Sequence, residues 1–263
     1  MKIEVKFIDA FTDEVFKGNP AAVIITEKWL SDQLMQTIAT ENNLSETAFA
    51  VKVADAKYKI RWFSPITEID FCGHATLAAA FVLFNRDSDI QELTFLADAV
   101  GDLTVTNNSN GYIQMNFPNR KPEKVIEIPN ALINGLSIQP QEIYLNKQAY
   151  FAVYHSENDI IAVTQDKEFI KKLAPLDVVV TSKSEQYDFI SRYFWPANGG
   201  DEDSVTGSIH AGLAPLWAEK LNRLKLSAYQ ASKRGGHLVC EVKNDRVFIS
   251  GQAVQYLEGF INV

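Results

Sequence analysis

The sequence contains one five-residue motif twice, about half a chain apart. Residues 61–65 read Arg-Trp-Phe-Ser-Pro and residues 192–196 read Arg-Tyr-Phe-Trp-Pro, so Arg-aromatic-Phe-x-Pro recurs after 192 − 61 = 131 residues. Each copy is followed by a loop with acidic residues, then by a glycine, and then by a stretch rich in Ala and Leu. Because the order of these features repeats together with the motif, the sequence predicts an internally duplicated α+β fold.

Hydrophobic periodicity predicts a similar series of elements in each half. In the first half we expect helices at 30–40, with Ser31 as N-cap, and from Gly73 to 84, and strands at 2–9, 21–25, 45–53, 58–63, 92–98, 101–106 and 111–117. In the second half we expect helices at 167–173 and from Gly207 to 221, and strands at 149–154, 160–164, 178–181, 187–195, 224–231, 236–243 and 246–250. Prolines 118, 122 and 129 interrupt the chain between the halves, so the predicted lobes are 1–117 and 118–263, with the last strands able to pack on the first lobe.

Charge and composition narrow the classes of partner. With 25 basic and 33 acidic residues the formal net charge is −8, which argues against nucleic acid and anionic membranes as partners. Two cysteines in 263 residues form no disulfide framework, which fits a reducing compartment. The longest uncharged stretch around the most apolar region, 71–85, is shorter than a membrane-spanning helix, and the N-terminus alternates like a strand. A cytoplasmic protein is the resulting expectation.

Gly73 and Gly207 each open a predicted helix. A helix start presents unpaired backbone N–H groups and the positive end of the helix dipole, which together can bind an anion. Two such starts, one per half, could face each other and hold a carboxylate or an enolate-like intermediate without a metal. The alternative is that both glycines only permit a tight turn from strand to helix.

Glu46 and His74 are the candidate acid/base residues of the first half. Glu46 lies among small and apolar residues, where desolvation would raise its pKa toward the range that general acid/base catalysis needs. His74 lies at a helix start, where the dipole favours its neutral form. The alternatives are a solvated glutamate at a strand edge and a histidine that only caps or packs.

Three further side chains are candidates for the functional site, and each also has a purely structural explanation. Asp203 precedes the second glycine in an acidic loop that could simply be exposed. Ser208 could donate to a substrate oxygen or cap its helix. Cys72 could act as a thiol base, but the corresponding stretch of the second half, 203–206, has no cysteine, and Cys240 is expected in the core.

Several common catalytic motifs are absent from the sequence. It has no Gly-x-x-x-x-Gly-Lys-Ser/Thr or Gly-x-Gly-x-x-Gly loop, no Cys-x-x-Cys or His-Glu-x-x-His spacing and no Gly-x-Ser-x-Gly elbow. The four histidines, at 74, 155, 210 and 237, are scattered, so no zinc site is predicted. A proton-transfer enzyme without a cofactor remains as the expectation.

Four motifs in order resemble a known family. They are Asp9-Ala10-Phe11-Thr12 with 18–23, Asn43 to Phe49, Phe71 to Thr76, and Gly200 to Ser208. The sequence resembles the PhzF-type isomerases of phenazine biosynthesis, whose fold is shared with diaminopimelate epimerase and proline racemase. The resemblance implies two lobes, each a β-barrel-like sheet around a central helix, with the active site between them, no cofactor, and a homodimer.

The resemblance also assigns roles to individual residues. The family's catalytic glutamate falls on Glu46, and its supporting His, Asp and Ser fall on His74, Asp203 and Ser208. The glycine-led helix starts fall on Gly73 and Gly207, beside which Ala75 and Thr206 are expected to contact substrate. The family usually has proline where this chain has Ser204, and its epimerase relatives use two cysteines where only Cys72 is present here.

These observations predict an isomerase that moves a proton within a small unsaturated carboxylate. Glu46 would take the proton and return it elsewhere on the same substrate, since one carboxylate can act first as base and then as acid. Two alternatives stay open at this point: a racemase or epimerase that uses Cys72, and a non-catalytic protein that binds small acids.

Overall fold

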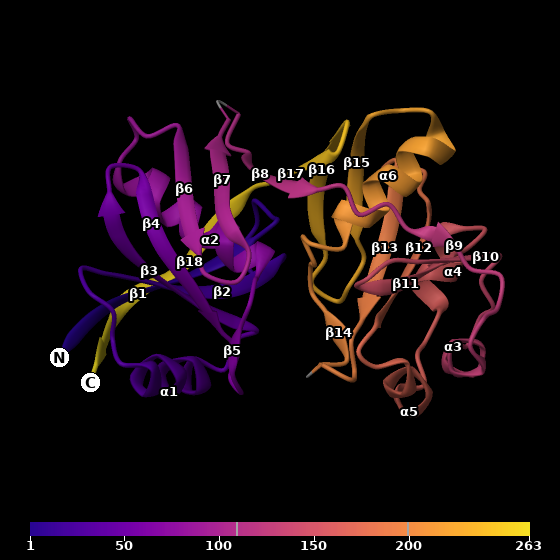
Figure 1. Ribbon diagram of the computed structural model, residues 1–263, viewed down its shortest axis with the longest axis horizontal. Helices are drawn as coiled ribbons and strands as arrows, with labels where there is room; N and C mark the ends of the chain where they lie inside the picture. The colour runs from indigo at the N-terminus through magenta and orange to yellow at the C-terminus, as the bar shows by residue number, and fades with distance from the viewer. Residues whose placement is uncertain (109, 199) are drawn as a thin grey trace. The chain divides into compact units, whose positions relative to one another are not determined.

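The computed structural model describes residues 1–108, 110–198 and 200–263, which form two compact units (Figure 1). Unit 1 comprises Met1–Asn116 and Ser250–Val263, and unit 2 comprises Phe117–Ile249. The C-terminal segment belongs to unit 1 because β18 (Ala253–Asn262) pairs antiparallel along the whole of β1 (Lys2–Ala10). The lobe boundary predicted from the sequence, at 117/118, assigns this segment to the second lobe, while allowing the last strands to pack on the first lobe.

Unit 1 is a mixed sheet with one helix inside it. Its remaining elements are β2 (Asn19–Thr26), α1 (Asp32–Asn42), β3 (Glu46–Ala54), β4 (Lys57–Phe63), β5 (Glu68–Ile69), α2 (Gly73–Arg86), β6 (Glu92–Ala97), β7 (Gly101–Asn107) and β8 (Ile113–Pro118). The pairs β1–β2 and β3–β4 are antiparallel, whereas β2–β3, joined through α1, and β4–β6, joined through α2, are parallel. The hairpins β6–β7 and β7–β8 complete the sheet.

Unit 2 repeats this order of elements and pairings. It contains β9 (Glu123–Lys124), α3 (Asn130–Gly135), β10 (Glu142–Leu145), β11 (Ala149–Val153), α4 (Glu157–Ala162), α5 (Lys167–Ile170), a 3₁₀ turn (Lys171–Leu173), β12 (Asp177–Lys183), β13 (Phe189–Phe194), β14 (Glu202–Asp203), α6 (His210–Leu221), β15 (Lys225–Gln230), β16 (Gly236–Lys243) and most of β17 (Arg246–Gly251), whose last two residues belong to unit 1. Here β10–β11 and β12–β13 are antiparallel, while β11–β12 and β13–β15 are parallel. The predicted duplication is therefore confirmed.

The repeated arginine makes the same ion pair in both units. In unit 1, Arg61 Nε and Nη2 lie 2.6 and 2.5 Å from the two carboxylate oxygens of Glu68. In unit 2, Arg192 Nε and Nη2 each lie 2.8 Å from the oxygens of Glu202. The glutamate is opposite the motif's phenylalanine in each sheet, at Phe63↔Glu68 and Phe194↔Glu202. A bidentate pair fixes both side chains in one plane, so the motif anchors the short strand that leads toward each central helix.

A nearly fully buried helix occupies the core of each unit. Eleven of the fourteen residues of α2 are buried, and the helix contacts β1, β2, β3, β7 and β18. Nine of the twelve residues of α6 are buried. Trp217 of α6 stacks on Phe189 of β13 and donates to Thr181 of β12 at 2.9 Å. A helix that is apolar on all sides must be covered on all sides, and the strands of each unit provide that cover, which confirms the predicted barrel-like sheet around a central helix.

Some of the predicted elements have different bounds or a different type. The prediction of a strand over 160–164 is wrong, because Ser156 and Asp159 form a capping box that starts α4 there. A short apolar run does not distinguish a strand from a buried helix. The helix predicted from Gly207 begins only at His210, after a turn in which the N–H groups of 210, 211 and 212 each donate three residues back.

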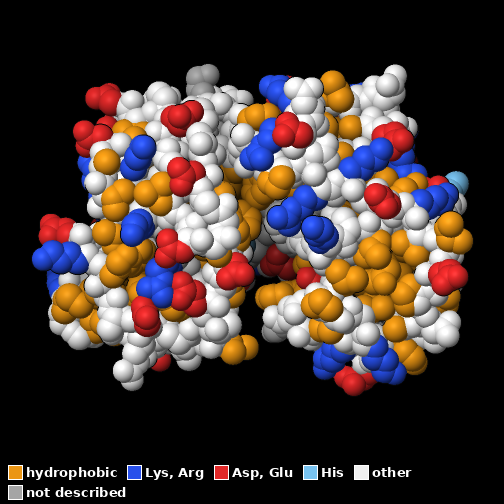
Figure 2. Space-filling view, in the orientation of Figure 1, with side chains coloured by type: hydrophobic (Ala, Val, Ile, Leu, Met, Phe, Trp, Pro, Cys, Tyr) orange, Lys and Arg blue, Asp and Glu red, His pale blue; other side chains and the backbone are white. Residues whose placement is uncertain are grey.

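Other predictions of local structure are confirmed. Ser31 caps α1, with Oγ accepting from Leu34 N at 3.3 Å, and Asn43 ends that helix in the left-handed conformation with φ 49°. Strand β18 was missed, because its pairing partner lies more than 240 residues away in sequence. Across the described ranges no helix is both long enough and apolar enough to cross a membrane. Acidic and basic side chains are interspersed on the visible face of each unit (Figure 2).

Gly18 allows a direct test of the turn that precedes β2. Its φ is +62°, and a Cβ at this position would lie 2.1 Å from the carbonyl oxygen of Ala10. Gly101 has φ +79° but open space around the corresponding position. We expect Gly101→Ala to cost about 1–2 kcal/mol from backbone conformation alone. Gly18→Ala should cost about 1–3 kcal/mol more because it also overpacks the turn.

Urea unfolding of both variants, followed by a probe in unit 1, measures this difference. Equal destabilisation by the two substitutions would contradict the close approach of the Gly18 turn to β1.

Candidate active site

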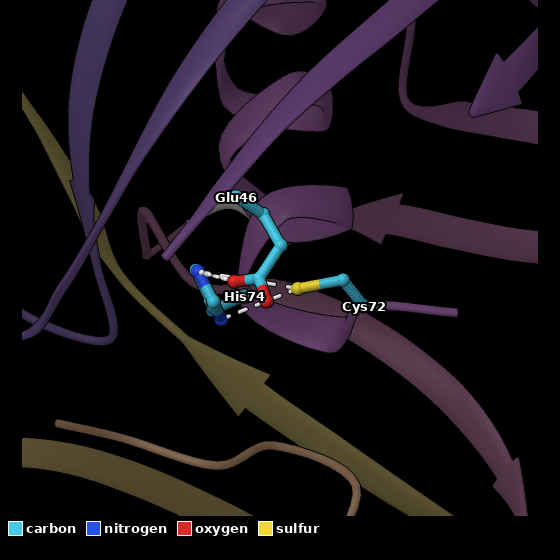
Figure 3. Close-up of side chains that lie close together, drawn as sticks. All are labelled: Glu46, Cys72 and His74. Atoms are coloured by element: carbon cyan, nitrogen blue, oxygen red, sulfur yellow. Dashed lines mark hydrogen bonds and ion pairs between the residues drawn. The ribbon is translucent and has the colours of Figure 1, made fainter. Parts of the chain in front are cut away.

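Three buried side chains with acid/base chemistry meet at the start of α2 in unit 1 (Figure 3). Glu46 is the first residue of β3, Cys72 is the N-cap of α2, and His74 is its second residue. Each is at most 7% exposed, and one donor atom of each lies within 4.8 Å of the others. The structure thus brings together Glu46, His74 and Cys72, which the sequence indicated only as separate candidates.

Local structure explains why these residues meet. The left-handed Asn43 ends α1 and turns the chain into β3, so that Glu46 enters the sheet opposite Ala21 of β2. Cys72 has an extended conformation, and the helix begins directly after it at Gly73. Because α2 is covered by strands, side chains at its first turn can extend only toward the end of the barrel where β3 begins.

His74 is the centre of the contacts in this cluster. Its Nε2 lies 3.1 Å from Oε2 of Glu46, and its Nδ1 lies 3.3 Å from Sγ of Cys72. Nδ1 also lies 3.1 Å from the amide nitrogen of Asn19, whose oxygen accepts from Ser45 at 3.2 Å. In the neutral imidazole, this orientation of the Asn19 amide makes Nδ1 the acceptor and puts the ring proton on Nε2, the nitrogen beside Glu46, whereas a protonated ring carries a proton on both nitrogens.

Sequence reasoning missed Asn19 and Ser45 as site residues. Both belong to motifs that carried the family resemblance, and Asn19 is fully buried. Their polar side chains next to runs of apolar residues were the available signal, but neither type is an acid or a base. Their positioning role becomes visible only once β2, β3 and α2 are assembled.

Burial and neighbouring charges shift the pKa values of two members of the cluster. Burial, reinforced by the Glu46 carboxylate, raises the pKa of the Cys72 thiol to about 11, so this thiol stays protonated at neutral pH. Burial lowers the pKa of His74, but the negative charges that Cys72 and Glu46 carry when ionised outweigh burial and raise it well above its usual value. Since the thiol is neutral at pH 7, the Glu46 carboxylate is the charge that holds a proton on His74.

The predicted residues of unit 2 form a group of their own. Asp203 lies on β14, and its carboxylate accepts from the hydroxyl of Thr206 at 2.5 Å. Gln230 of β15 accepts from Thr206 N at 2.9 Å and donates to the Asp203 carbonyl at 3.0 Å. Both donors of Thr206 are thereby used inside the protein. The loop before Gly207 is held by Gln230, a residue that the sequence analysis did not identify.

Ser208 ends a chain of polar contacts in unit 2. Its Oγ accepts from Gln148 Nε2 at 2.9 Å, and Gln148 also donates to Tyr193 Oη at 3.2 Å. Tyr193 in turn donates to Asp177 at 2.5 Å. Burial raises the pKa of Asp177. Tyr193 is the variable aromatic residue of the repeated motif, so in unit 2 the motif also supports a predicted substrate-binding residue.

The two glycine-led helix starts differ in detail. Gly73 is the first residue of α2, and Ala75 behind it is fully buried. Gly207 starts the turn that precedes α6, and Ser208 lies within that turn. Gly73 and Ala75 therefore belong to the unit 1 cluster with Glu46 and His74, whereas Gly207 and Ser208 belong to the unit 2 group with Asp203 and Thr206.

One surface groove is made by other residues. It lies in unit 2, has a volume of about 830 Å³, and is lined by His155, Ser156, Glu157, Asn158, Lys183, Ser184, Glu185 and Gln186. None of these residues belongs to either predicted group. This groove therefore does not coincide with either group of candidate residues.

Comparison with known proteins places this fold in a defined class. The chain aligns over 99% of its length with a hydroxyproline epimerase from Agrobacterium vitis, covering 91% of it, at 10% identity and a TM-score of 0.62. That likeness defines the epimerase-like fold alone. The structure of a phenazine biosynthesis protein of the PhzF family from Enterococcus faecalis aligns over 100% of both chains, at 45% identity and a TM-score of 0.95.

Sequence comparison identifies the family. The model of the family described as phenazine biosynthesis-like protein matches residues 8–259. A Pseudomonas aeruginosa protein named as an uncharacterized isomerase is 42% identical over 263 residues, covering 100% of both chains. The chain belongs to the phenazine biosynthesis-like (PhzF) family, and the resemblance carried by the four sequence motifs is confirmed.

Gln230 offers a test of how the Asp203 loop is held. Gln230 is fully buried. Gln230→Ala leaves the N–H of Thr206 and the carbonyl of Asp203 without this partner, and an unpaired buried polar group costs roughly 1–3 kcal/mol. We expect unit 2 to lose at least about 2 kcal/mol of unfolding free energy in urea. The exposed Gln186→Ala is the control and should change it little, and similar values for the two variants would show that Gln230 does not hold the loop.

The burial of His210 predicts that the stability of the folded protein depends on pH. It is fully buried, its Nδ1–H donates to the Thr206 carbonyl at 2.9 Å, and burial lowers its pKa to about 4. The unfolded chain, with a histidine pKa of about 6.5, then binds more protons than the folded chain between about pH 4 and 6.5. The contribution of His210 is complete above about pH 6.5, and about 3 kcal/mol is lost as the pH falls to about 4.

His210→Asn keeps a donor near the Thr206 carbonyl and removes the titrating ring. Urea unfolding at pH 7 and pH 4.5 should therefore show a smaller loss of stability in this variant than in the parent protein. The exposed His155→Asn should keep the parent's loss. An unchanged loss in His210→Asn would contradict the neutral buried imidazole.

Proposed function

We propose that this protein is an isomerase that moves a proton within a small unsaturated carboxylate, with Glu46 as the acid/base group and without a cofactor in the proton-transfer step. The observation that carries the proposal is the buried Glu46 carboxylate 3.1 Å from Nε2 of His74 at the start of α2. The relatives named as isomerases support the reaction class.

Glu46 can perform both halves of a proton shift. Its carboxylate takes a proton from a carbon next to an unsaturated or carbonyl group, and the electron pair of that C–H bond delocalises into the substrate. The protonated Glu46 then gives the proton to another carbon of the same delocalised system, which shifts the double bond and restores the carboxylate. A positioned carboxylate that acts in this way contributes typically about 10²–10⁴-fold to the rate.

His74 supports this role through its proton. Its Nε2 lies 3.1 Å from Oε2 of Glu46, so a proton on Nε2 steadies the carboxylate electrostatically, without a well-aligned hydrogen bond, and can donate to negative charge that develops on the substrate. Asn19 and Ser45 fix the orientation of the ring from the other side. The N–H groups at the start of α2 add positive potential next to the same side chains, which favours a substrate carboxylate despite the net charge of −8.

In unit 2, Asp203 and Ser208 are proposed to hold the polar groups of the substrate. Asp203 is oriented by Thr206, and Ser208 by Gln148. Their own hydrogen bonds limit the rotamers that each side chain can adopt, which is what a binding residue needs to select one orientation of a small ligand.

A racemase based on Cys72 is less well supported than the glutamate reaction. A thiol base must be ionised, and burial next to Glu46 opposes ionisation of Cys72. A two-thiol mechanism also needs a second cysteine, and Cys240 is fully buried in β16. A protein that only binds small acids would need no acid/base group at the helix start, so the Glu46–His74 pair argues against it.

Solvent exchange tests the proposal without knowledge of the natural substrate. We expect deuterium from D₂O to enter at least one member of a panel of small β,γ-unsaturated carboxylates, vinylglycine among them, as measured by NMR. Glu46→Gln should lower that exchange by about 10²–10⁴-fold, because an amide cannot accept the proton. Cys72→Ala should retain it within about tenfold, since the thiol is the matched control from the same cluster.

Other outcomes would decide between the alternatives. Loss of exchange in Cys72→Ala with activity kept in Glu46→Gln would establish the thiol reaction instead. Tight binding of a carboxylate with no exchange anywhere in the panel would support the binding protein.

A further inference from the structure

We propose that Glu46, Cys72 and His74 form a binding site for a thiophilic divalent cation of the Zn²⁺ type, and that a bound cation and proton transfer by Glu46 exclude each other. Cation binding stands on the geometry of the three side chains. Only the second part, inhibition, rests on the proposed function.

The three side chains are a zinc-type set of donors. A thiolate, an imidazole and a carboxylate are the ligand types that Zn²⁺ uses, and three protein ligands leave a fourth tetrahedral position for water or another ligand. Mg²⁺ and Ca²⁺ prefer sites made of oxygen atoms, so one sulfur and one nitrogen among three donors select against them.

Distances between the donors approach those of a tetrahedral site. With Zn–N and Zn–O bonds of about 2.0–2.1 Å and a Zn–S bond of about 2.3 Å, adjacent ligands lie about 3.4 Å (N to O) and about 3.6 Å (N to S) apart. In unit 1, His74 Nε2 lies 3.1 Å from Glu46 Oε2 and 3.9 Å from Cys72 Sγ. Both separations are within about 0.3 Å of the tetrahedral values. The Glu46 carboxylate and Cys72 Sγ lie within 4.8 Å of each other, and Sγ is nearer to Nδ1, at 3.3 Å, than to Nε2. The imidazole and thiol side chains therefore have to rotate before one cation can touch all three.

The second observation is the state of the Glu46 carboxylate. Within the described residues its Oε2 is fully buried and has no well-aligned hydrogen bond, although His74 Nε2 lies 3.1 Å away. A buried carboxylate oxygen without an aligned donor is costly. A cation at this place would satisfy that oxygen.

A positioning residue for the histidine ligand is also present. A histidine that binds a metal through Nε2 usually donates its Nδ1–H to a neighbouring acceptor. Asn19 lies 3.1 Å from Nδ1, and rotating its amide would present the oxygen there, while the Ser45 hydroxyl can accept as well as donate. The cluster thus offers three candidate ligands and one further side chain, Asn19, that can orient the histidine ligand.

Cation binding would remove the groups that move the proton. A carboxylate bound to a cation is a poor base, and a metal-bound Nε2 carries no proton. Cys72 has no part in the proposed proton shift, but it would supply the sulfur that makes the site selective. The cation would therefore act as an inhibitor that a chelator reverses.

Co²⁺ is the probe, because a thiolate bound to Co²⁺ produces a near-ultraviolet charge-transfer band. Protein treated with chelator and then freed of it is titrated with Co²⁺, and Zn²⁺ is then added in competition. We expect one equivalent of Co²⁺ to produce the band, Zn²⁺ to abolish it, and a large excess of Mg²⁺ to leave it unchanged.

Substitutions test which side chains bind the cation. Loss of a residue that only orients a ligand costs about 10–100-fold in affinity, so loss of a direct ligand should cost at least about 100-fold. Cys72→Ser should remove the band, and Glu46→Gln should weaken binding while changing the shape of the side chain least. The matched control, Cys240→Ala, removes the other buried cysteine and should keep both band and affinity. Circular dichroism checks that each variant is folded.

The results separate this proposal from the proposed function. Absence of the band in folded parent protein, or the same band in Cys72→Ser, would overturn the cation site. If Co²⁺ binds as expected but Glu46→Gln keeps full exchange activity, the site stands and the function proposed for Glu46 fails. If Zn²⁺ binds and the exchange rate is unchanged or rises, the exclusion between cation and proton transfer is overturned.

Discussion

Each unit depends on the complete burial of an apolar helix inside a curved sheet. Alanine and leucine fill the middle of α2, where strands contact the helix from several sides and leave no room for a charged side chain. Polar groups on such a helix can be accommodated only at its ends. The burial that stabilises unit 1 therefore also determines where its chemistry lies: His74 comes at the first turn, and Glu46 meets it from the start of the neighbouring strand β3.

The two units share the same arrangement of strands and ion pairs but differ in the polar side chains at the starts of their central helices. The bidentate arginine–glutamate pair recurs with the same register, and the parallel pairings recur around both central helices. At the helix starts, however, unit 1 has a histidine next to a carboxylate, whereas unit 2 has Ser208 on a chain of neutral donors and Asp203 in a loop fixed by Gln230. The two units therefore share an equivalent framework but carry different polar side chains at their helix starts.

Much of this frame could be predicted from the sequence because it is encoded locally. The motif at Arg61 and Arg192, the cap at Ser31 and the apolar composition of both central helices each act within a few residues of chain. The capping box that starts α4 was also local, but the apolar run after it was misread as a strand. By contrast, β18 and the contacts of Asn19 and Gln230 depend on segments far apart in sequence, so no local pattern reports them. Glu46 and His74 could be predicted as individual candidates, and their contact with Cys72 could not.

The return of β18 to unit 1 has a consequence for the order in which the chain can fold during synthesis. Unit 2 is one continuous segment, Phe117–Ile249, and all of its strands and helices are made before β18 is. β18, the second partner of β1 beside β2, is made only afterwards. One edge of β1 therefore stays unpaired until the whole of unit 2 has been synthesised. Domains usually fold from the N-terminus as they emerge, and here the later unit is the first that can be completed. An unpaired strand edge is prone to wrong pairing, so β1 is exposed to wrong partners during this interval.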